Sequence, residues 1–220
     1  MRRAALAALF AVALAGCGSS STSGAGQATV WVTRDRGAVV LHDAKVPAGV
    51  SAMQALDRVA SVKTRFGGRY VRGVDGVEEH GRHSWFYYVN GYLADRSAAD
   101  YRLRAGDVEW WDYRSWRDPA QDPVVIGAFP QPFLSGYDGK RRPAVVVSTD
   151  AGARAVAKRL HARVVRRAPA GANVLVLGGN ATTIVLHGSS PGSPVRLVFR
   201  GDPKLLLRRW PFRYRYEVDG

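Results

Sequence analysis

Aromatic side chains gather between residues 84 and 113, where they could form a binding surface. One run, WFYYV at 85–89, precedes Asn90-Gly91, and a second, EWWDY, spans 109–113. Side chains alternate along a strand, so each run presents aromatic groups on two faces. Because Trp110 and Trp111 must point to opposite faces, we expect at least one of them to reach solvent or a partner. An exposed aromatic patch with a polar rim is typical of a binding site, and core packing is the alternative for each residue.

Two histidines suggest metal chemistry, which the rest of the sequence does not support. His80 and His83 are three residues apart beside Glu78 and Glu79, a spacing that could hold a metal ion. No second ligand pair accompanies them, so we predict a solvated polar loop and no metal site. The sequence also lacks a nucleophile elbow, a phosphate-binding loop and a zinc-protease motif. These observations predict a binding protein and not an enzyme.

The single cysteine, Cys17, lies where a lipoprotein signal requires it. Arg2 and Arg3 precede a short apolar stretch at 4–15, and LAGC at 14–17 has the pattern of a lipobox. Residues 1–17 are therefore predicted to be a lipoprotein signal peptide with Cys17 as the lipidation site; an ordinary secretory signal is the alternative. The apolar stretch is shorter than the roughly 20 residues that span a bilayer. We expect a lipid-anchored protein on the extracytoplasmic face of the cell membrane.

The elements that position the aromatic runs follow a Ser- and Gly-rich stretch at 18–27, which predicts a flexible tether. Alternation at 29–32 and 38–41 around a turn at 35–37 predicts a hairpin, and Ser51 is the expected N-cap of a helix with apolar residues at 53, 56, 59 and 60. Strands are expected at 69–76, 84–90 and 107–116, with Asn90-Gly91 as a tight turn. This order fits an α+β, β-grasp-like N-terminal domain at 28–117.

Residues beyond a proline-containing linker at 117–123 predict a second small α+β domain at 125–220. A strand at 144–147 precedes a helix capped by Thr149 or Asp150 and running through Val165. A hairpin of strands at 173–177 and 181–186 turns at Gly178-Gly179-Asn180, and further strands are expected at 195–199 and 212–218. We expect a sandwich with one helix.

The aromatic motif also resembles a known family. Trp-x-Tyr-Tyr-x-Asn-Gly at 85–91, with Ala-Asp-Tyr at 99–101 and Gly-Asp-Val at 106–108, is similar to the transcobalamin-like C-terminal domain, also called domain of unknown function 4430. The resemblance, over about residues 28–115, implies a β-grasp-like fold and a lid over one face of a corrinoid such as cobalamin. The residues that the resemblance implies as ligand contacts are Trp85, Tyr87 and Asn90, with Tyr92 and Tyr101 behind them. The vitamin carriers of this family have a large helical domain, which we do not expect in this chain.

Charge divides the chain into unequal parts and leaves a second function open. Residues 17–124 contain 14 Lys and Arg against 13 Asp and Glu, whereas residues 125–220 contain 16 against 5. Outside the cytoplasm, nucleic acid is not an expected partner, but anionic lipid and wall polymers attract such a surface. We therefore expect either a ligand-binding accessory to uptake, working with a transporter, or an envelope protein that binds anionic polymer, lipid or a protein partner through its basic half. Arg141-Arg142, Arg166-Arg167 and Arg208-Arg209 are the clusters of interest.

Overall fold

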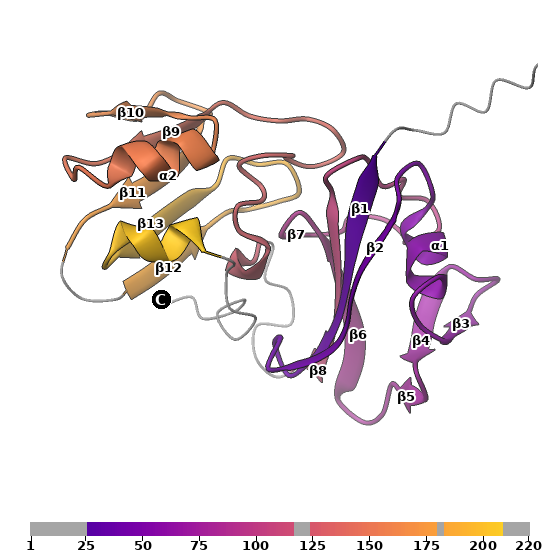
Figure 1. Ribbon diagram of the computed structural model, residues 1–220. Helices are drawn as coiled ribbons and strands as arrows, with labels where there is room; N and C mark the ends of the chain where they lie inside the picture. Colours follow the sequence, from indigo (N-terminus) through magenta and orange to yellow (C-terminus); the bar gives the residue numbers. More distant parts are fainter. Residues whose placement is uncertain (1–25, 117–123, 180–182, 209–220) are drawn as a thin grey trace, which may run out of the picture.

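The chain is described from a computed structural model over residues 26–116, 124–179 and 183–208. Strands predominate over helices, and the described strands form three sheets, consistent with an α+β or mostly β fold. We refer to residues 26–116 as the first module, 124–143 as the connecting segment and 144–208 as the second module. Figure 1 shows the two modules side by side with the connecting segment between them.

The first module pairs a five-stranded sheet with a small three-stranded sheet. The large sheet has the order β2-β1-β8-β6-β7, with β1 and β8 parallel and the other neighbours antiparallel; the small sheet has the order β3-β4-β5. The predicted opening hairpin, helix and three later strands are confirmed, whereas β3, β5 and β7 were not predicted. The elements are β1 (Gln27–Arg34), β2 (Val39–Pro47), α1 (Ala52–Asp57), β3 (Val62–Arg65), β4 (Tyr70–Val74), β5 (Val77–Glu78), β6 (His83–Val89), β7 (Tyr92–Leu93) and β8 (Val108–Ser115).

Local sequence explains where α1 and the first hairpin turn. The Ser51 hydroxyl accepts from the backbone N–H of Gln54, and the Gln54 side chain accepts from the Ser51 N–H, which makes a capping box. The turn at 35–37 has three consecutive residues with positive φ. The buried Asp112 carboxylate accepts from the N–H groups of Arg36 (3.0 Å) and Gly37 (3.1 Å), so β8 fixes this turn.

Both faces of the large sheet are covered, which makes one prediction wrong. Trp110 is fully buried and Trp111 is 3% exposed, so neither reaches solvent. Trp111 lies in the main core, and Trp85 on the same side reaches the small sheet by donating from Nε1 to the Val77 carbonyl at 2.9 Å. Trp110 packs with Tyr88 and with Val125 of the connecting segment on the other face. Sequence alternation identified the two faces but could not reveal that the chain covers both.

The second module is a mainly parallel sheet of order β10-β9-β11-β13-β12. Strands β10, β9, β11 and β13 run parallel, and β12 is antiparallel to β13. The helix α2 connects β9 to β10 and packs, with the second 3-10 helix, near the sheet (Figure 1). The elements from the connecting segment onward are η1 (Ile126–Ala128), β9 (Ala144–Val147), α2 (Ala153–Arg159), β10 (Arg163–Val165), β11 (Asn173–Leu177), β12 (Thr183–His187), β13 (Arg196–Arg200) and η2 (Pro203–Leu207).

Three expectations for the second module are wrong, the first because the N-cap of α2 is Gly152 and not Thr149 or Asp150. The helix does not run through Val165: it ends at Arg159, His161 has a positive φ of 49°, and the β-branched residues that follow form β10. The predicted hairpin of 173–177 with 181–186 does not form, because β13 lies between β11 and β12. Local turn residues could not disclose a strand inserted from later in the chain.

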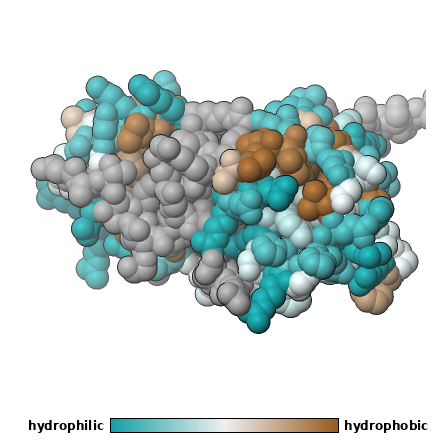
Figure 2. Space-filling model, turned by 90° about the horizontal axis from the view of Figure 1, so that it is seen from below, coloured by the Kyte–Doolittle hydropathy of each residue, from teal (hydrophilic) through white to brown (hydrophobic). Residues whose placement is uncertain are grey.

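Several predictions fall outside the described residues: the signal peptide with Cys17, most of the tether, the linker at 117–123, the strand at 212–218 and Arg209. Among the coloured residues in Figure 2, hydrophilic ones predominate, and the larger of the brown hydrophobic patches lies over the first module. No helix in the described ranges is both long and apolar enough to cross a membrane.

Candidate functional site

Four of the five predicted ligand contacts are buried within the chain. Trp85, Asn90, Tyr92 and Tyr101 are each 6% exposed or less, and only Tyr87 is half-buried. The Tyr87 ring stacks on Trp111, and its hydroxyl donates to the Arg96 carbonyl at 2.8 Å. That these residues contact a ligand stays a prediction, and in this conformation their polar groups already have partners in the chain.

Asn90 fixes the turn between β6 and β7 and holds the connecting segment against it. Its Nδ2 donates to Asp107 Oδ1 at 2.7 Å and to the Gly136 carbonyl at 2.8 Å, and its Oδ1 accepts from the Val108 N–H at 2.8 Å. Asn90 and Gly91 have φ values of 52° and 87°, which confirms the tight turn. Burial raises the pKa of Asp107, against the lowering effect of hydrogen bonds from Arg104 and Asn90.

Tyr92 and Tyr101 also face other parts of the chain. The Tyr92 hydroxyl donates to the Ser193 carbonyl of the second module at 2.8 Å, and burial raises the pKa of Tyr92 to about 12. The Tyr101 oxygen accepts from the Asp138 N–H at 2.9 Å. The end of the first module that the resemblance predicts to face a ligand is therefore covered by residues 124–143 and 188–195.

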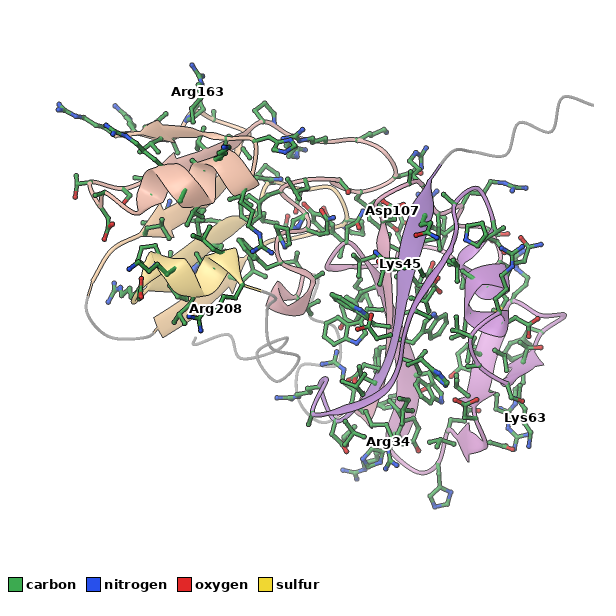
Figure 3. The ribbon with its side chains drawn as sticks, viewed as in Figure 1. Arg34, Lys45, Lys63, Asp107, Arg163 and Arg208 are labelled. Carbon is green, nitrogen blue, oxygen red and sulfur yellow. The ribbon has the colours of Figure 1, made fainter. Side chains whose placement is uncertain are left out.

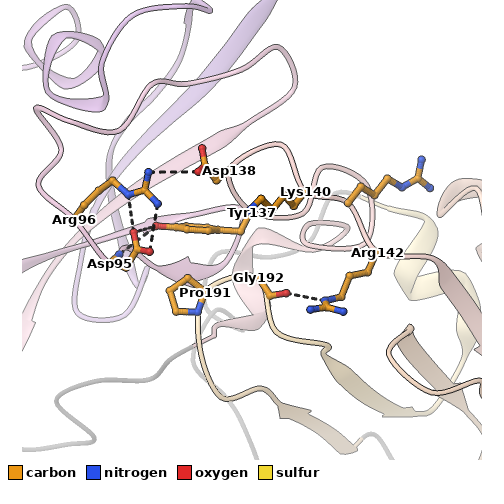
Figure 4. A pocket seen from close by; sticks show the side chains of 9 residues that line it. Asp95, Arg96, Tyr137, Asp138, Lys140, Arg142, Pro191 and Gly192 are labelled. Carbon is orange, nitrogen blue, oxygen red and sulfur yellow. Dashed lines mark hydrogen bonds and ion pairs between the residues drawn. The ribbon is translucent and has the colours of Figure 1, made fainter.

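A cavity of about 470 Å³ lies at this junction, and we call it the junction pocket. Two carboxylates line it, those of Asp95 and Asp138, together with four basic side chains, those of Arg96, Lys140, Arg141 and Arg142. The rest of the wall is formed by Tyr137, Pro191 and Gly192. Figure 4 shows side chains from the first module and the connecting segment converging on it, opposite Pro191 and Gly192 of the second module. The excess of cations favours an anionic ligand.

Ion pairs link the charged groups on one side of the junction pocket. Arg96 binds Asp95 through Nε at 2.8 Å and lies 3.4 Å from Asp138, and the Tyr137 hydroxyl donates to Asp95 at 2.7 Å. The hydrogen bond from Arg96 is the main reason that the pKa of Asp95 is lowered. Across the pocket, Lys140 has no ion pair with any described residue, so its ammonium is available to a ligand.

Most of this pocket was not predicted from the sequence. Arg141 and Arg142 form one of the basic clusters noted in the sequence. Arg96, Tyr137 and Gly192, by contrast, lie far apart in the chain, and no local pattern links them. The predicted histidine loop contributes nothing to it: His80 and His83 form an isolated bridge, and His83 stacks on Tyr113. The described residues hold no group of three or more His, Cys, Asp or Glu that could bind a metal ion.

Comparison with known families identifies part of the first module. Residues 49–115 match the family described as Domain of unknown function (DUF4430). The matched stretch begins just before α1 and ends with β8, so it contains all five predicted contact residues. The chain thus carries a DUF4430 domain, as the aromatic motif indicated. No curated protein sequence matches the chain.

Proposed function

We propose that this protein is an extracytoplasmic lipoprotein that is anchored through Cys17 and binds a small anionic ligand in the junction pocket. The observation that carries the proposal is the pocket itself, where cations exceed carboxylates and Lys140 lacks a described counterion. Its volume lies within the range of about 300–1,000 Å³ typical of small-molecule sites.

The resemblance suggests that the ligand is a corrinoid such as cobalamin, of which only the anionic phosphate group would enter the junction pocket, and that the protein is an accessory to its uptake. We interpret the first module as β-grasp-like because α1 lies against a mixed sheet whose central strands β1 and β8 are parallel. In the vitamin carriers a separate domain completes the pocket. Here the connecting segment contacts Asn90 and the second module contacts Tyr92, so we propose that these two parts complete the pocket within one chain. Presentation of the ligand to a transporter would follow release from this site.

The experiment is a calorimetric titration of the purified full chain with cobalamin and its corrinoid precursors. We expect saturable binding that weakens at least about tenfold in the double variant Arg96→Gln/Lys140→Gln, which removes two pocket cations. Lys204→Gln/Arg208→Gln, which removes two exposed cations outside the pocket, is the matched control and should bind normally. Saturable binding unchanged by the pocket variant would place the ligand elsewhere, and no binding would remove the corrinoid from consideration.

A second candidate function is envelope interaction through the basic half. Residues 140–208 contain 13 Lys and Arg against two Asp, and within the described part of this stretch none of these cations forms an ion pair. In the first module, by contrast, Lys63, Arg65, Arg69 and Arg72 all pair with carboxylates. Charge reversal at Arg166 and Arg167 should weaken association with anionic envelope material, and binding should fall as salt rises.

A further inference from the structure

A second cavity, of about 500 Å³, lies at the β9–β10 edge of the second sheet, and we call it the edge cavity. Its basic lining groups are Arg141, Arg142, Arg163 and His161, and Pro143 and Val145 belong to its apolar wall. No carboxylate lines it. A cavity with cationic groups beside an apolar wall suits a phosphate that is attached to a nonpolar group.

Backbone carbonyls position two of these arginines without neutralising them. Arg142 donates from Nε to the Gly192 carbonyl at 2.7 Å and from Nη1 to the Gly171 carbonyl at 3.3 Å. Arg141 donates weakly from Nη2 to the Leu160 carbonyl at 3.4 Å. Because no described carboxylate pairs with Arg141, Arg142 or Arg163, their charges remain available to an external anion.

Two contacts near the start of β1 lead to the segment that precedes the edge cavity. The Gly106 N–H donates to the Gln27 carbonyl at 2.8 Å, and nearby Arg104 forms an ion pair with Asp138 at 3.0 Å. Asp138 precedes the Lys140-Arg141-Arg142 run by two residues. In Figure 1, β1 begins at the upper end of the first module, and Figure 3 shows Arg163 at the upper edge of the second module, pointing away from it. The start of β1 and the edge cavity therefore lie on the same side of the molecule.

The proposed anchor would hold this side close to the membrane. Gln27 follows Cys17 by ten positions, and a fully extended chain of that length spans at most about 35 Å. A lipid on Cys17 would therefore keep the start of β1, on the side of the molecule where the edge cavity also lies, within about 35 Å of the headgroups. Anionic lipids attract Lys and Arg that lie within about a Debye length of the surface.

We infer that the edge cavity binds the phosphodiester headgroup of an anionic lipid in the membrane to which the chain is anchored. This inference rests on the proposed lipid anchor. Arg141 and Arg163 contact the phosphate, Arg142 supports it from a position fixed by two carbonyls, and the apolar wall lies against the glycerol and upper acyl region. The contact orients the molecule and sets the direction in which the junction pocket opens.

The experiment compares hydrogen exchange of the full lipidated chain in two kinds of vesicle, one of phosphatidylcholine alone and one with about 30% phosphatidylglycerol. The anchor holds the protein in both, so a difference reports the headgroup contact. We expect exchange at 140–145 and 161–169 to slow about twofold or more with phosphatidylglycerol, while 62–74 in the first module stays unchanged. Arg141→Glu/Arg163→Glu should lose this protection. Lys204→Glu/Arg208→Glu, with the same change in charge, is the control and should keep it; Arg208 lies on the lower side of the second module (Figure 3).

Each remaining result is decisive. Equal exchange in both vesicles, or equal loss of protection in the control variant, would overturn the headgroup site. A third sample, phosphatidylcholine vesicles with inorganic phosphate or a soluble glycerol-phosphate polymer, tests other sources of the same anion; protection there that matches the anionic vesicles would overturn the assignment to lipid. The intact mass of the purified chain separately tests the anchor, because an unmodified Cys17 refutes the proposed lipoprotein without any exchange measurement.

Discussion

Glu109 places a carboxyl group in the core of the first module with a hydrogen bond to only one of its oxygens. It is fully buried, Oε1 accepts from Trp111 Nε1 at 2.5 Å, and no described residue donates to Oε2. Burial raises the pKa of Glu109 well above its usual value, against a smaller lowering by the Trp111 hydrogen bond. The folded chain therefore holds this proton more tightly than the unfolded chain. The contribution of Glu109 to stability should fall as pH rises above the unfolded-state pKa of about 4.3.

We predict that Glu109→Gln removes this dependence because the side chain is neutral at every pH. The difference in unfolding free energy between Glu109→Gln and wild type near pH 4 serves as the reference. As pH rises from there, the stability of the variant relative to wild type should increase by up to about 1.4 kcal/mol per pH unit, until pH reaches the folded-state pKa of Glu109. Urea unfolding near pH 4, 6 and 8 measures it. Asp57→Asn at the exposed end of α1 is the control, and its unfolding free energy should depend on pH as that of wild type does. A difference between Glu109→Gln and wild type that is the same at all three pH values would contradict the prediction that the buried carboxyl group makes stability depend on pH.

Trp85 tests whether an aromatic residue of the family motif serves the core or a ligand. It is 6% exposed, and its ring packs against Tyr113 with the ring centres 5.3 Å apart. We predict that Trp85→Ala lowers the unfolding free energy by about 3–5 kcal/mol, as for other large buried aromatics, and that Trp85→Phe costs less because it keeps most of the ring. Chemical denaturation measures both. Loss of corrinoid binding by Trp85→Ala with wild-type stability would instead support direct contact with a ligand.

At the scale of elements, the β6–β7 turn is shaped by contact with the connecting segment as well as by its own conformation. The Val125 N–H donates to the Gly91 carbonyl at 2.7 Å, and a Cβ added at Gly91 would lie 2.8 Å from the Val125 carbonyl oxygen. Gly76, in the turn between β4 and β5, has a similar φ of 80° and nothing within 4 Å of an added Cβ. The two glycines therefore separate backbone strain from steric contact.

We predict that Gly91→Ala destabilises the chain more than Gly76→Ala does. An alanine at positive φ should lower the unfolding free energy by about 1–3 kcal/mol in both variants, and only Gly91→Ala also displaces the connecting segment. Hydrogen exchange should show faster exchange at Val125 in Gly91→Ala and no change there in Gly76→Ala. Equal unfolding free energies for the two variants would indicate that the connecting segment can move away from residue 91 without a loss of stability.

At the scale of the whole molecule, the contact between the modules depends on a few polar groups and a shared core. The main core cluster contains Leu56 and Trp111 of the first module, Phe133 of the connecting segment and Leu175 of the second module. The Tyr92 hydroxyl crosses from the first module to the Ser193 carbonyl. Continuity of the core means that loosening this contact should affect the second module as well as the first.

We predict that Tyr92→Phe lowers the unfolding free energy by about 0.5–1.5 kcal/mol and speeds hydrogen exchange at 188–195. Tyr87→Phe is the matched control, because it also removes one hydroxyl hydrogen bond to a carbonyl, but one that stays within the first module. It should leave exchange at 188–195 unchanged. Identical exchange patterns in the two variants would show that the Tyr92 hydroxyl does not couple the modules.

The sequence alone was enough to predict the features that depend on near neighbours. Ser51 is the expected N-cap of α1, the predicted turns at 35–37 and 90–91 form, and residues 49–115 match the family that the aromatic motif indicated. Alternation also located the strands that carry the aromatic runs. Each of these depends on contacts between residues close in sequence or on a short motif, so the local pattern contains the required information.

Only the tertiary structure decided what those strands face and where a ligand could enter. The burial of Trp110, the insertion of β13 between β11 and β12, and the meeting of Arg96 with Tyr137 and Gly192 all join residues that lie far apart in the chain. The alternation of residues shows which side chains share a face of a strand. It does not show whether that face is exposed to water or covered by another part of the protein. The physical reason is that burial and electrostatic environment are properties of the packed chain, which a local pattern does not contain.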